Sequence, residues 1–351
     1  MDSNFVSIVG YQLEKVHTGV IRWLLDSKNQ SISFEQKYEI LRRVYKVCNM
    51  SIPFSINEIC NISCIPEFSF GRKRKIDLVI KIDLINSKTK YLVIEMKVDS
   101  IPYEEQLIGT YNDFIQSKKY DEDALFLLFL FGASQVCMIP DLHGFHIFRL
   151  PEILEVFSGY HIEQNVYKDW IQALRYENMR RRCIGLDING VDNIWEEEYW
   201  KDKGYRTWFP LFYYIYNELR KTSKRFNEWN IYSGHNNPVM NWSKGWVTRY
   251  ILGSKIQFYF EFNYEDFILK IMLDKNNMIS KDNLNMLRKE IVKICETIIK
   301  FKGKRTSNKY GVSNSIYKWT FDFKKEGLSE VMKKVDYILD TVYPMLENFK
   351  M

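Results

Sequence analysis

The sequence predicts an α/β domain, a mixed sheet flanked by helices, followed by a second domain of the α+β class. Two short runs rich in β-branched and apolar residues, 76–80 and 91–97, have the composition of central strands. Amphipathic segments with helical spacing precede and follow them, for example at Val16, Val20 and Leu24. In the second half of the chain the expected strands are instead grouped together between helices, which is typical of an α+β domain.

The first domain is expected to comprise residues 1–182. Its expected elements are helices at 4–27 and 34–47, a short strand at 68–70, strands at 76–80 and 91–97, a helix at 102–117, strands at 124–131 and 145–149, and helices from Pro151 to about 182. The polar turn at 86–88 predicts that the strands on either side form an antiparallel hairpin. Pro102 suits the first turn of a helix because its missing N–H has no partner there.

Residues 183–204 lose clear periodicity and are expected to link the first domain to a C-terminal domain at 205–351. The elements expected there are helices at 205–224, 281–300 and 327–348, strands at 229–233, 246–252, 255–263, 266–274 and 316–323, and a tight turn at Gly253-Ser254. The role left open for this domain is target recognition, regulation or assembly. The helical spacing of Trp208, Phe212 and Tyr216 indicates core packing.

Three further tryptophans flank a polar loop at 233–237 in the second domain: Trp229, Trp242 and Trp246. Such a loop either contacts a nucleic-acid groove or an extruded base, or is a plain surface connection. The sequence leaves both interpretations open.

Composition places the chain among globular proteins, with 46% hydrophobic and 27% charged residues in 351. The longest apolar run, 124–133, is about half the length of a membrane span and fits a buried strand. The six cysteines form no CxxC pair and indicate reduced thiols rather than zinc ligands. Without an evident signal peptide or membrane segment, we expect a cytoplasmic protein.

The net charge of +6 is modest, but basic residues gather directly before the strand at 76–80. We expect this cluster to bind nucleic-acid phosphates, and it consists of Arg72, Lys73, Arg74 and Lys75. Looser clusters occur at 180–182 and 300–309. Each of these is also explained by an ordinary solvated surface.

Both strands of the expected hairpin carry acids where buried strands are normally apolar. Alternation places Glu95 and Lys97 on one face at the end of their strand, with Cα atoms about 7 Å apart. If the strands pair, Asp77 lies beside Glu95. Two converging carboxylates repel each other and lose hydration, so a compensating divalent cation is expected. Lys97 next to such a cation indicates catalysis.

The order Asp77, then Glu95-Met96-Lys97 after an apolar run, resembles the core signature of the PD-(D/E)XK nuclease superfamily, which includes many restriction endonucleases. Glu14 in the first helix, and Gln106-Leu107 with Tyr111 in the helix after Lys97, extend the resemblance to a bacterial branch. The resemblance covers roughly residues 5–150 and implies a restriction-endonuclease-like fold. The proline of the signature is absent, because Ile76 precedes Asp77.

The chemistry of phosphodiester hydrolysis and the resemblance together suggest roles for these residues. Mg²⁺ prefers oxygen ligands, so Asp77 and Glu95 are expected to bind it, with the backbone carbonyl of Met96 as a third ligand and Mn²⁺ as a substitute. Lys97 would orient the attacking water or neutralise developing charge. The resemblance implies that Glu14 holds a second metal or its water, and that Gln106 positions the water or the phosphate.

Each residue also has a structural interpretation. Asp77 could bond to backbone at a strand edge, and Glu95 with Lys97 could form a salt-bridged surface. Glu14 could be an exposed helix acid, and Tyr111 suits core packing. His17 is expected to be structural, whereas Glu67 is a further candidate ligand.

The sequence therefore predicts a Mg²⁺-dependent endonuclease acting on DNA, and the resemblance implies a role in restriction or anti-phage defence. Two alternatives remain open: an RNA nuclease, which the same residues would serve, and a module on the same fold that binds nucleic acid without cutting it. A homodimer is left open, and no membrane partner is expected.

Overall fold

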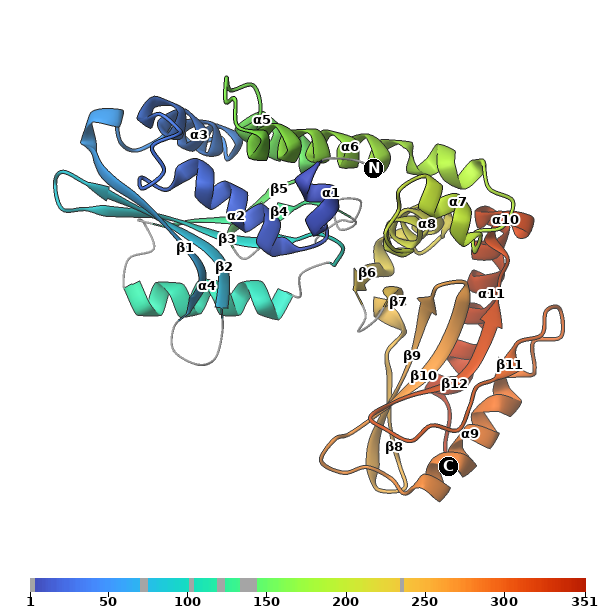
Figure 1. Cartoon of the computed structure of the whole chain (residues 1–351). Coiled ribbons are helices and arrows are strands. Elements are labelled where there is room, and N and C mark those ends of the chain that lie inside the picture. The colour runs from blue at the N-terminus through green and yellow to red at the C-terminus, as the bar shows by residue number, and fades with distance from the viewer. Residues whose placement is uncertain (1–3, 70–74, 101–103, 119–123, 133–143, 234–236) are drawn as a thin grey trace. The chain divides into compact units, whose positions relative to one another are not determined.

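The computed structural model describes residues 4–69, 75–100, 104–118, 124–132, 144–233 and 237–351 (Figure 1). The chain forms two compact units, Met1–Asp187 and Ile188–Met351. The change between them falls inside one long helix, α6 (Asn165–Asn189). In the described part of the chain, no helix combines the length and apolar character that a bilayer crossing requires.

The first unit contains a five-stranded mixed sheet with the order β1-β2-β3-β4-β5. Its strands are β1 (Ile59–Ser69), β2 (Lys75–Leu84), β3 (Thr89–Lys97), β4 (Ala124–Leu130) and β5 (Phe145–Phe148). The first three are antiparallel neighbours, whereas β3, β4 and β5 run parallel. The predicted hairpin of β2 and β3 is confirmed, and Ser87 adopts the left-handed backbone (φ 62°) in its turn.

Helices cover both faces of this sheet (Figure 1). On one face lie α1 (Phe5–Val9), α2 (Glu14–Leu25), α3 (Phe34–Val47), α5 (Leu150–Phe157) and α6. The other face is covered by α4 (Glu104–Lys118), whose Leu107 and Phe114 are fully buried against it. Alternation along β3 explains the two layers, because Leu92 and Ile94 point into the larger core and Val93 into the smaller one. The predicted α/β class with a flanked mixed sheet is confirmed.

The prediction of one continuous helix at 4–27 is wrong, because this segment forms two helices. Gly10 ends α1 in a positive-φ conformation (φ 118°), and its N–H caps the Val6 carbonyl at 2.9 Å. The chain then turns through Tyr11–Leu13 before α2 starts at Glu14. A glycine inside an apolar periodic stretch is tolerated in many helices, so the hydrophobic pattern alone concealed this break.

The second unit contains an antiparallel sheet with the order β11-β12-β10-β9-β7-β6, and β8 also pairs with β9. Its strands are β6 (Trp229–Ser233), β7 (Pro238–Trp242), β8 (Val247–Ile251), β9 (Ser254–Asn263), β10 (Asp266–Leu273), β11 (Lys304–Arg305) and β12 (Ser313–Thr320). The helices are α7 (Glu197–Asp202), α8 (Phe209–Thr222), α9 (Lys281–Cys295), α10 (Phe323–Glu326) and α11 (Leu328–Glu347). Short 3₁₀ turns occur at Phe226–Glu228 and Ser243–Gly245 in this unit, and at Ile56–Glu58 in the first unit.

The second unit differs from expectation in its connections. The segment 183–204, expected as a linker, contains the end of α6 and the whole of α7. Strand β7 was missed because it opens with Pro238, yet its five residues are all buried between β6 and β9. The tight turn falls at Leu252-Gly253, one residue earlier than predicted, and both residues have positive φ. Such a pair suits a two-residue hairpin turn.

Aromatic side chains fill the core of the second unit. Phe212 and Tyr216 of α8 are fully buried, as their helical spacing predicts. Trp229 and Trp242 are also buried, so both are structural. Trp246 stacks on Tyr259 with ring centroids 4.3 Å apart. Most of the polar loop between β6 and β7 lies outside the described residues, so its proposed contact with a base stays a prediction.

Candidate active site

The candidate site lies where β2 and β3 separate. Their backbone pairing stops at Leu78 and Ile94, which leaves Asp77 and Glu95 as the next two facing positions. Here the Met96 N–H donates to Asp77 Oδ2 at 2.7 Å. A backbone donor inside a fold requires an acceptor. The Asp77 carboxylate therefore replaces a strand carbonyl, which fixes its position beside β3.

Glu95 projects from β3 into the face of the sheet that α4 covers, and it is only 1% exposed. The Thr110 hydroxyl donates to Glu95 Oε1 at 2.9 Å, and Gln106 Nε2 donates to Oε2 at 3.3 Å. The two donors are four residues apart on α4, so they lie on the same side of the helix. Each oxygen of the buried carboxyl group thus has a partner from α4.

The charge state of Glu95 depends on Asp77. Burial, followed by repulsion from Asp77, raises the pKa of Glu95 to about 8, whereas Lys97 and Thr110 act in the opposite direction. Glu95 therefore retains its proton near neutral pH. A positive charge beside the pair would favour the ionised form instead.

Lys97 lies among the acids with an exposed side-chain fraction of 11%. Its Nζ donates to the Met96 carbonyl at 2.8 Å, and lies 3.6 Å from Glu14 Oε1 and 3.9 Å from Asp77 Oδ2. The ammonium group can therefore donate a hydrogen bond to an anion that lies beside Glu14 or Asp77.

Glu14 comes from a distant part of the sequence, the first residue of α2. Burial raises the pKa of Glu14, the Lys97 ammonium opposes this rise, and Asp77 adds to it. The structure thus brings Glu14, Asp77, Glu95, Lys97 and Gln106 together from four elements.

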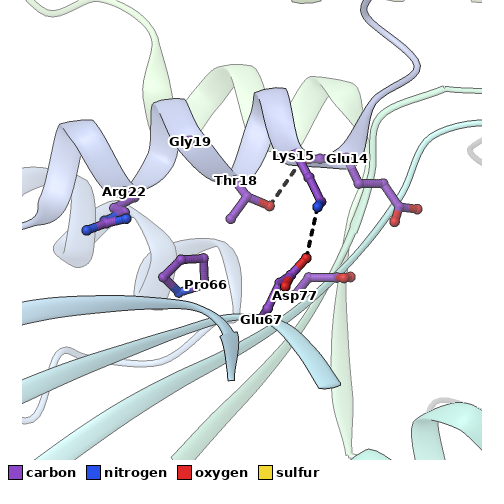
Figure 2. Close-up of a pocket in the computed structure, with 8 residues that line it drawn as sticks. All are labelled: Glu14, Lys15, Thr18, Gly19, Arg22, Pro66, Glu67 and Asp77. Carbon is purple, nitrogen blue, oxygen red and sulfur yellow. Dashed lines mark hydrogen bonds and ion pairs between the residues drawn. The ribbon is translucent and has the colours of Figure 1, made fainter. Parts of the chain in front are cut away.

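A groove of about 470 Å³ leads to these acids. Figure 2 shows it between α2 and the ends of β1 and β2, with Glu14 and Arg22 at opposite ends of the α2 wall. The lining residues are Glu14, Lys15, Thr18, Gly19, Arg22, Pro66, Glu67 and Asp77. A polymeric substrate could enter along this wall and place one of its groups next to Asp77.

A family model matches the part of the sequence that forms this site. The model described as "PD-(D/E)XK nuclease superfamily" matches residues 3–181, just over half of the 351 residues. The chain belongs to this superfamily. No curated protein and no solved structure matches the sequence of this chain. Membership in the PD-(D/E)XK superfamily confirms the resemblance read from the sequence and implies a hydrolase that acts on nucleic acid.

PD-(D/E)XK nucleases typically use divalent metals, which require oxygen or nitrogen donor groups at the site. Across the described residues, no group of three or more His, Cys, Asp or Glu side chains is arranged as a metal cluster. The oxygens of Asp77, Glu95 and the Met96 carbonyl are nevertheless the ligands that hard cations prefer. Repulsion from Asp77 is one cause of the raised pKa of Glu95, and a cation beside the two acids would relieve that repulsion. The donor set fits a divalent cation.

The basic cluster predicted to bind nucleic acid is only partly described. Arg72, Lys73 and Arg74 lie outside the described residues. Lys75 opens β2, and its ammonium lies 3.0 Å from the carboxylate of Glu67. Phosphate binding by the four residues stays a prediction.

Three other residues discussed from the sequence have clear surroundings. His17 is fully buried, accepts from Trp170 Nε1 at its Nδ1 (3.1 Å) and donates from Nε2 to the Tyr11 carbonyl (2.8 Å), so it is structural. Tyr111 packs against Phe126 with ring centroids 4.7 Å apart. Glu67 lines the groove opposite Asp77 and adopts a left-handed backbone (φ 48°).

The sequence analysis missed Thr110, Lys15 and Arg22. Thr110 follows Gln106 by four residues, and this helical spacing was a usable signal. The two cations of α2 could not be placed in the groove that leads to the acids, because only the packing of α2 on β1 and β2 forms it.

Proposed function

We propose that this PD-(D/E)XK protein is a Mg²⁺-dependent endonuclease that hydrolyses phosphodiester bonds in DNA, with Mn²⁺ as a substitute. The observation that carries the proposal is the convergence of Asp77, Glu95 and Lys97 at the inner end of an open groove. Phosphodiester cleavage adds negative charge to an already anionic group, and these residues provide the means to hold and neutralise it.

Asp77, Glu95 and the Met96 carbonyl would hold the cation, and Glu14 would complete the acidic side of the site. When bound, a divalent cation supplies positive charge that polarises a phosphate oxygen and lowers the pKa of nearby water. Gln106 and Thr110 orient the Glu95 carboxyl group through their hydrogen bonds. Lys97 donates to a phosphate oxygen or to the attacking water.

The biological setting is proposed on the family membership alone. Restriction or anti-phage defence in the cytoplasm is a role consistent with a nuclease of this superfamily. The second unit would serve target recognition, regulation or assembly, and a homodimer is one such assembly. RNA cleavage remains the alternative reaction, because the same residues would serve it.

A plasmid cleavage assay tests the proposal. We expect nicking or cutting with Mg²⁺ or Mn²⁺, none with EDTA, and a rate reduced by about 100-fold or more in Lys97→Ala, because a positioned proton donor typically contributes this much. Glu95→Gln should be at least as impaired. The matched control is Lys81→Ala, which removes a lysine of β2 that pairs with Asp83 (2.9 Å) away from the site.

Three outcomes would count against the proposal. Full activity of Lys97→Ala would remove the role of this lysine. Cleavage of RNA but not DNA would change the substrate. Tight DNA binding without cleavage at any divalent metal would favour the non-cleaving module.

A further inference from the structure

The groove beside the acids extends along α2 well beyond the residues assigned to chemistry. Its α2 wall presents Lys15, Thr18, Gly19 and Arg22 (Figure 2). Lys15, Thr18, Gly19 and Arg22 have no part in the metal-binding and proton-transferring groups proposed above. A substrate must also be held in position for cleavage, and this wall lies where such contacts are needed.

The two cations of this wall are available to a ligand. Arg22 is exposed, and within the described part of the chain its side chain forms no ion pair. Lys15 lies 3.1 Å from Glu67, with side chains 85% and 48% exposed, respectively. Ion pairs this exposed contribute little, so a phosphate could replace the Glu67 carboxylate as the partner of Lys15.

The spacing of these cations matches a nucleic-acid strand. Lys15 and Arg22 are seven residues apart on α2, which places them on the same face at a distance of about 10 Å along the helix axis. One DNA strand advances by about 3.4 Å per nucleotide along the duplex axis, so a span of about 10 Å is covered by a few nucleotides at most. One continuous strand can therefore contact both cations.

Gly19 lies between the two cations on the same side of the helix. A glycine in a helix interior costs up to about 1 kcal/mol relative to alanine. Packing within the described residues does not require this glycine, because a Cβ added there would have no neighbour within 4 Å. The missing side chain instead leaves the middle of the groove open to a ligand backbone.

We propose that this groove binds the sugar-phosphate backbone of the strand that leads to the scissile phosphate. Lys15 and Arg22 contact its phosphates, and Gly19 lets the backbone approach α2 closely. The proposal rests on the nucleic-acid substrate of the proposed function. It adds the path of one strand and the residues that hold it.

The test measures DNA binding without cleavage, by fluorescence anisotropy of a fluorescein-labelled DNA oligonucleotide in EDTA with the full-length protein. We expect Arg22→Gln to weaken binding about tenfold, as for a lost charge-assisted contact. The slope of log affinity against log salt should fall in magnitude by about 1. The control Arg175→Gln removes an exposed arginine of α6 outside the groove and should change neither value.

A second pair of variants tests the middle of the groove. Gly19→Glu places a negative side chain where the strand would pass and should weaken binding more than the nearly isosteric Gly19→Gln. Circular dichroism and thermal unfolding of each variant show whether it is folded. A folded Gly19→Glu protein that binds DNA like the wild type would overturn the proposal.

Parallel plasmid assays separate this proposal from the proposed function. If the wild type does not cut DNA but binds it more tightly than Arg22→Gln does, the result would support the proposed role of the groove. It would contradict the proposed nuclease function. DNA cleavage by the wild type, combined with equal DNA affinities of the wild type, Arg22→Gln and Arg175→Gln, would overturn the proposed role of the groove and leave the proposed nuclease function intact.

Discussion

Glu95 is a buried acid whose charge is set by neighbours from different elements. Asp77 and burial favour its protonated form, whereas Lys97 and Thr110 favour the carboxylate. The order of acids and lysine in the sequence indicated that these groups would meet. It could not give the protonation state, because that depends on the depth of burial and on α4. Thr110 is the residue that the sequence motif omits and the folded site includes.

This balance predicts a pH-dependent stability in the metal-free protein. The folded-state pKa of Glu95 is about 8, above its ordinary value of 4.5, so the folded state holds a proton that the unfolded chain releases. The contribution of Glu95 to stability is therefore full below pH 4.5 and is lost progressively as the pH rises towards 8. Glu14, whose pKa is also raised, acts in the same direction. Thermal unfolding in EDTA across this range measures the effect.

Comparison with Glu95→Gln isolates the contribution of this residue, because the other titrating groups are common to both proteins. The melting temperature of the variant should fall less steeply with pH than that of the wild type. Parallel curves for the two proteins would contradict the shifted pKa.

At the scale of elements, the sequence predicted most helices and strands around the candidate site but not all their connections. The patterns at 34–47 and 91–97 were informative because apolar spacing and strand alternation are strong there. The break at Gly10 and strand β7 were missed, since each depends on a local backbone feature within an apolar stretch. The bend at Glu67, which has positive φ without being glycine, carries no sequence signal of its own.

Helix α2 provides a prediction at this scale. Gly19→Ala should raise the free energy of unfolding by up to about 1 kcal/mol, because alanine favours the helix and its methyl group would have no neighbour within 4 Å among the described residues. Gly132→Ala is the contrasting control, since its Cβ would lie 2.4 Å from the Val98 carbonyl and should destabilise the fold. Denaturant unfolding measures both. A destabilised Gly19→Ala protein would mean that the glycine has a role in packing.

At the scale of the whole molecule, the buried residues described for the two hydrophobic cores of the first unit all come from that unit. All their buried members lie between Val6 and Leu174. The candidate site draws its residues from the same range, from Glu14 to Thr110. The motif predicted that this half carries the chemistry. The family match to residues 3–181 agrees with this location.

We therefore expect a fragment of residues 1–189, which contains the whole of α6, to fold by itself. It should unfold cooperatively and retain the cation-dependent plasmid cleavage proposed for the full chain. A fragment ending at 164 lacks Trp170 and Leu174, which are fully buried in the larger core, and should not fold. Calorimetry of both fragments gives the answer. Absence of a cooperative transition in the longer fragment would show that the second unit is needed for stability.

The hydrogen bond from the Met96 N–H to the Asp77 carboxylate affects how an inactive protein should be engineered. Asp77→Ala would remove a candidate ligand and also leave this amide without its acceptor, at a cost of about 1–3 kcal/mol if water cannot replace it. Loss of activity in that variant would mix a chemical cause with a structural one. Glu95→Gln keeps the size of the side chain and the strand ending intact. It is therefore the better choice for trapping an uncut nucleic acid on the protein.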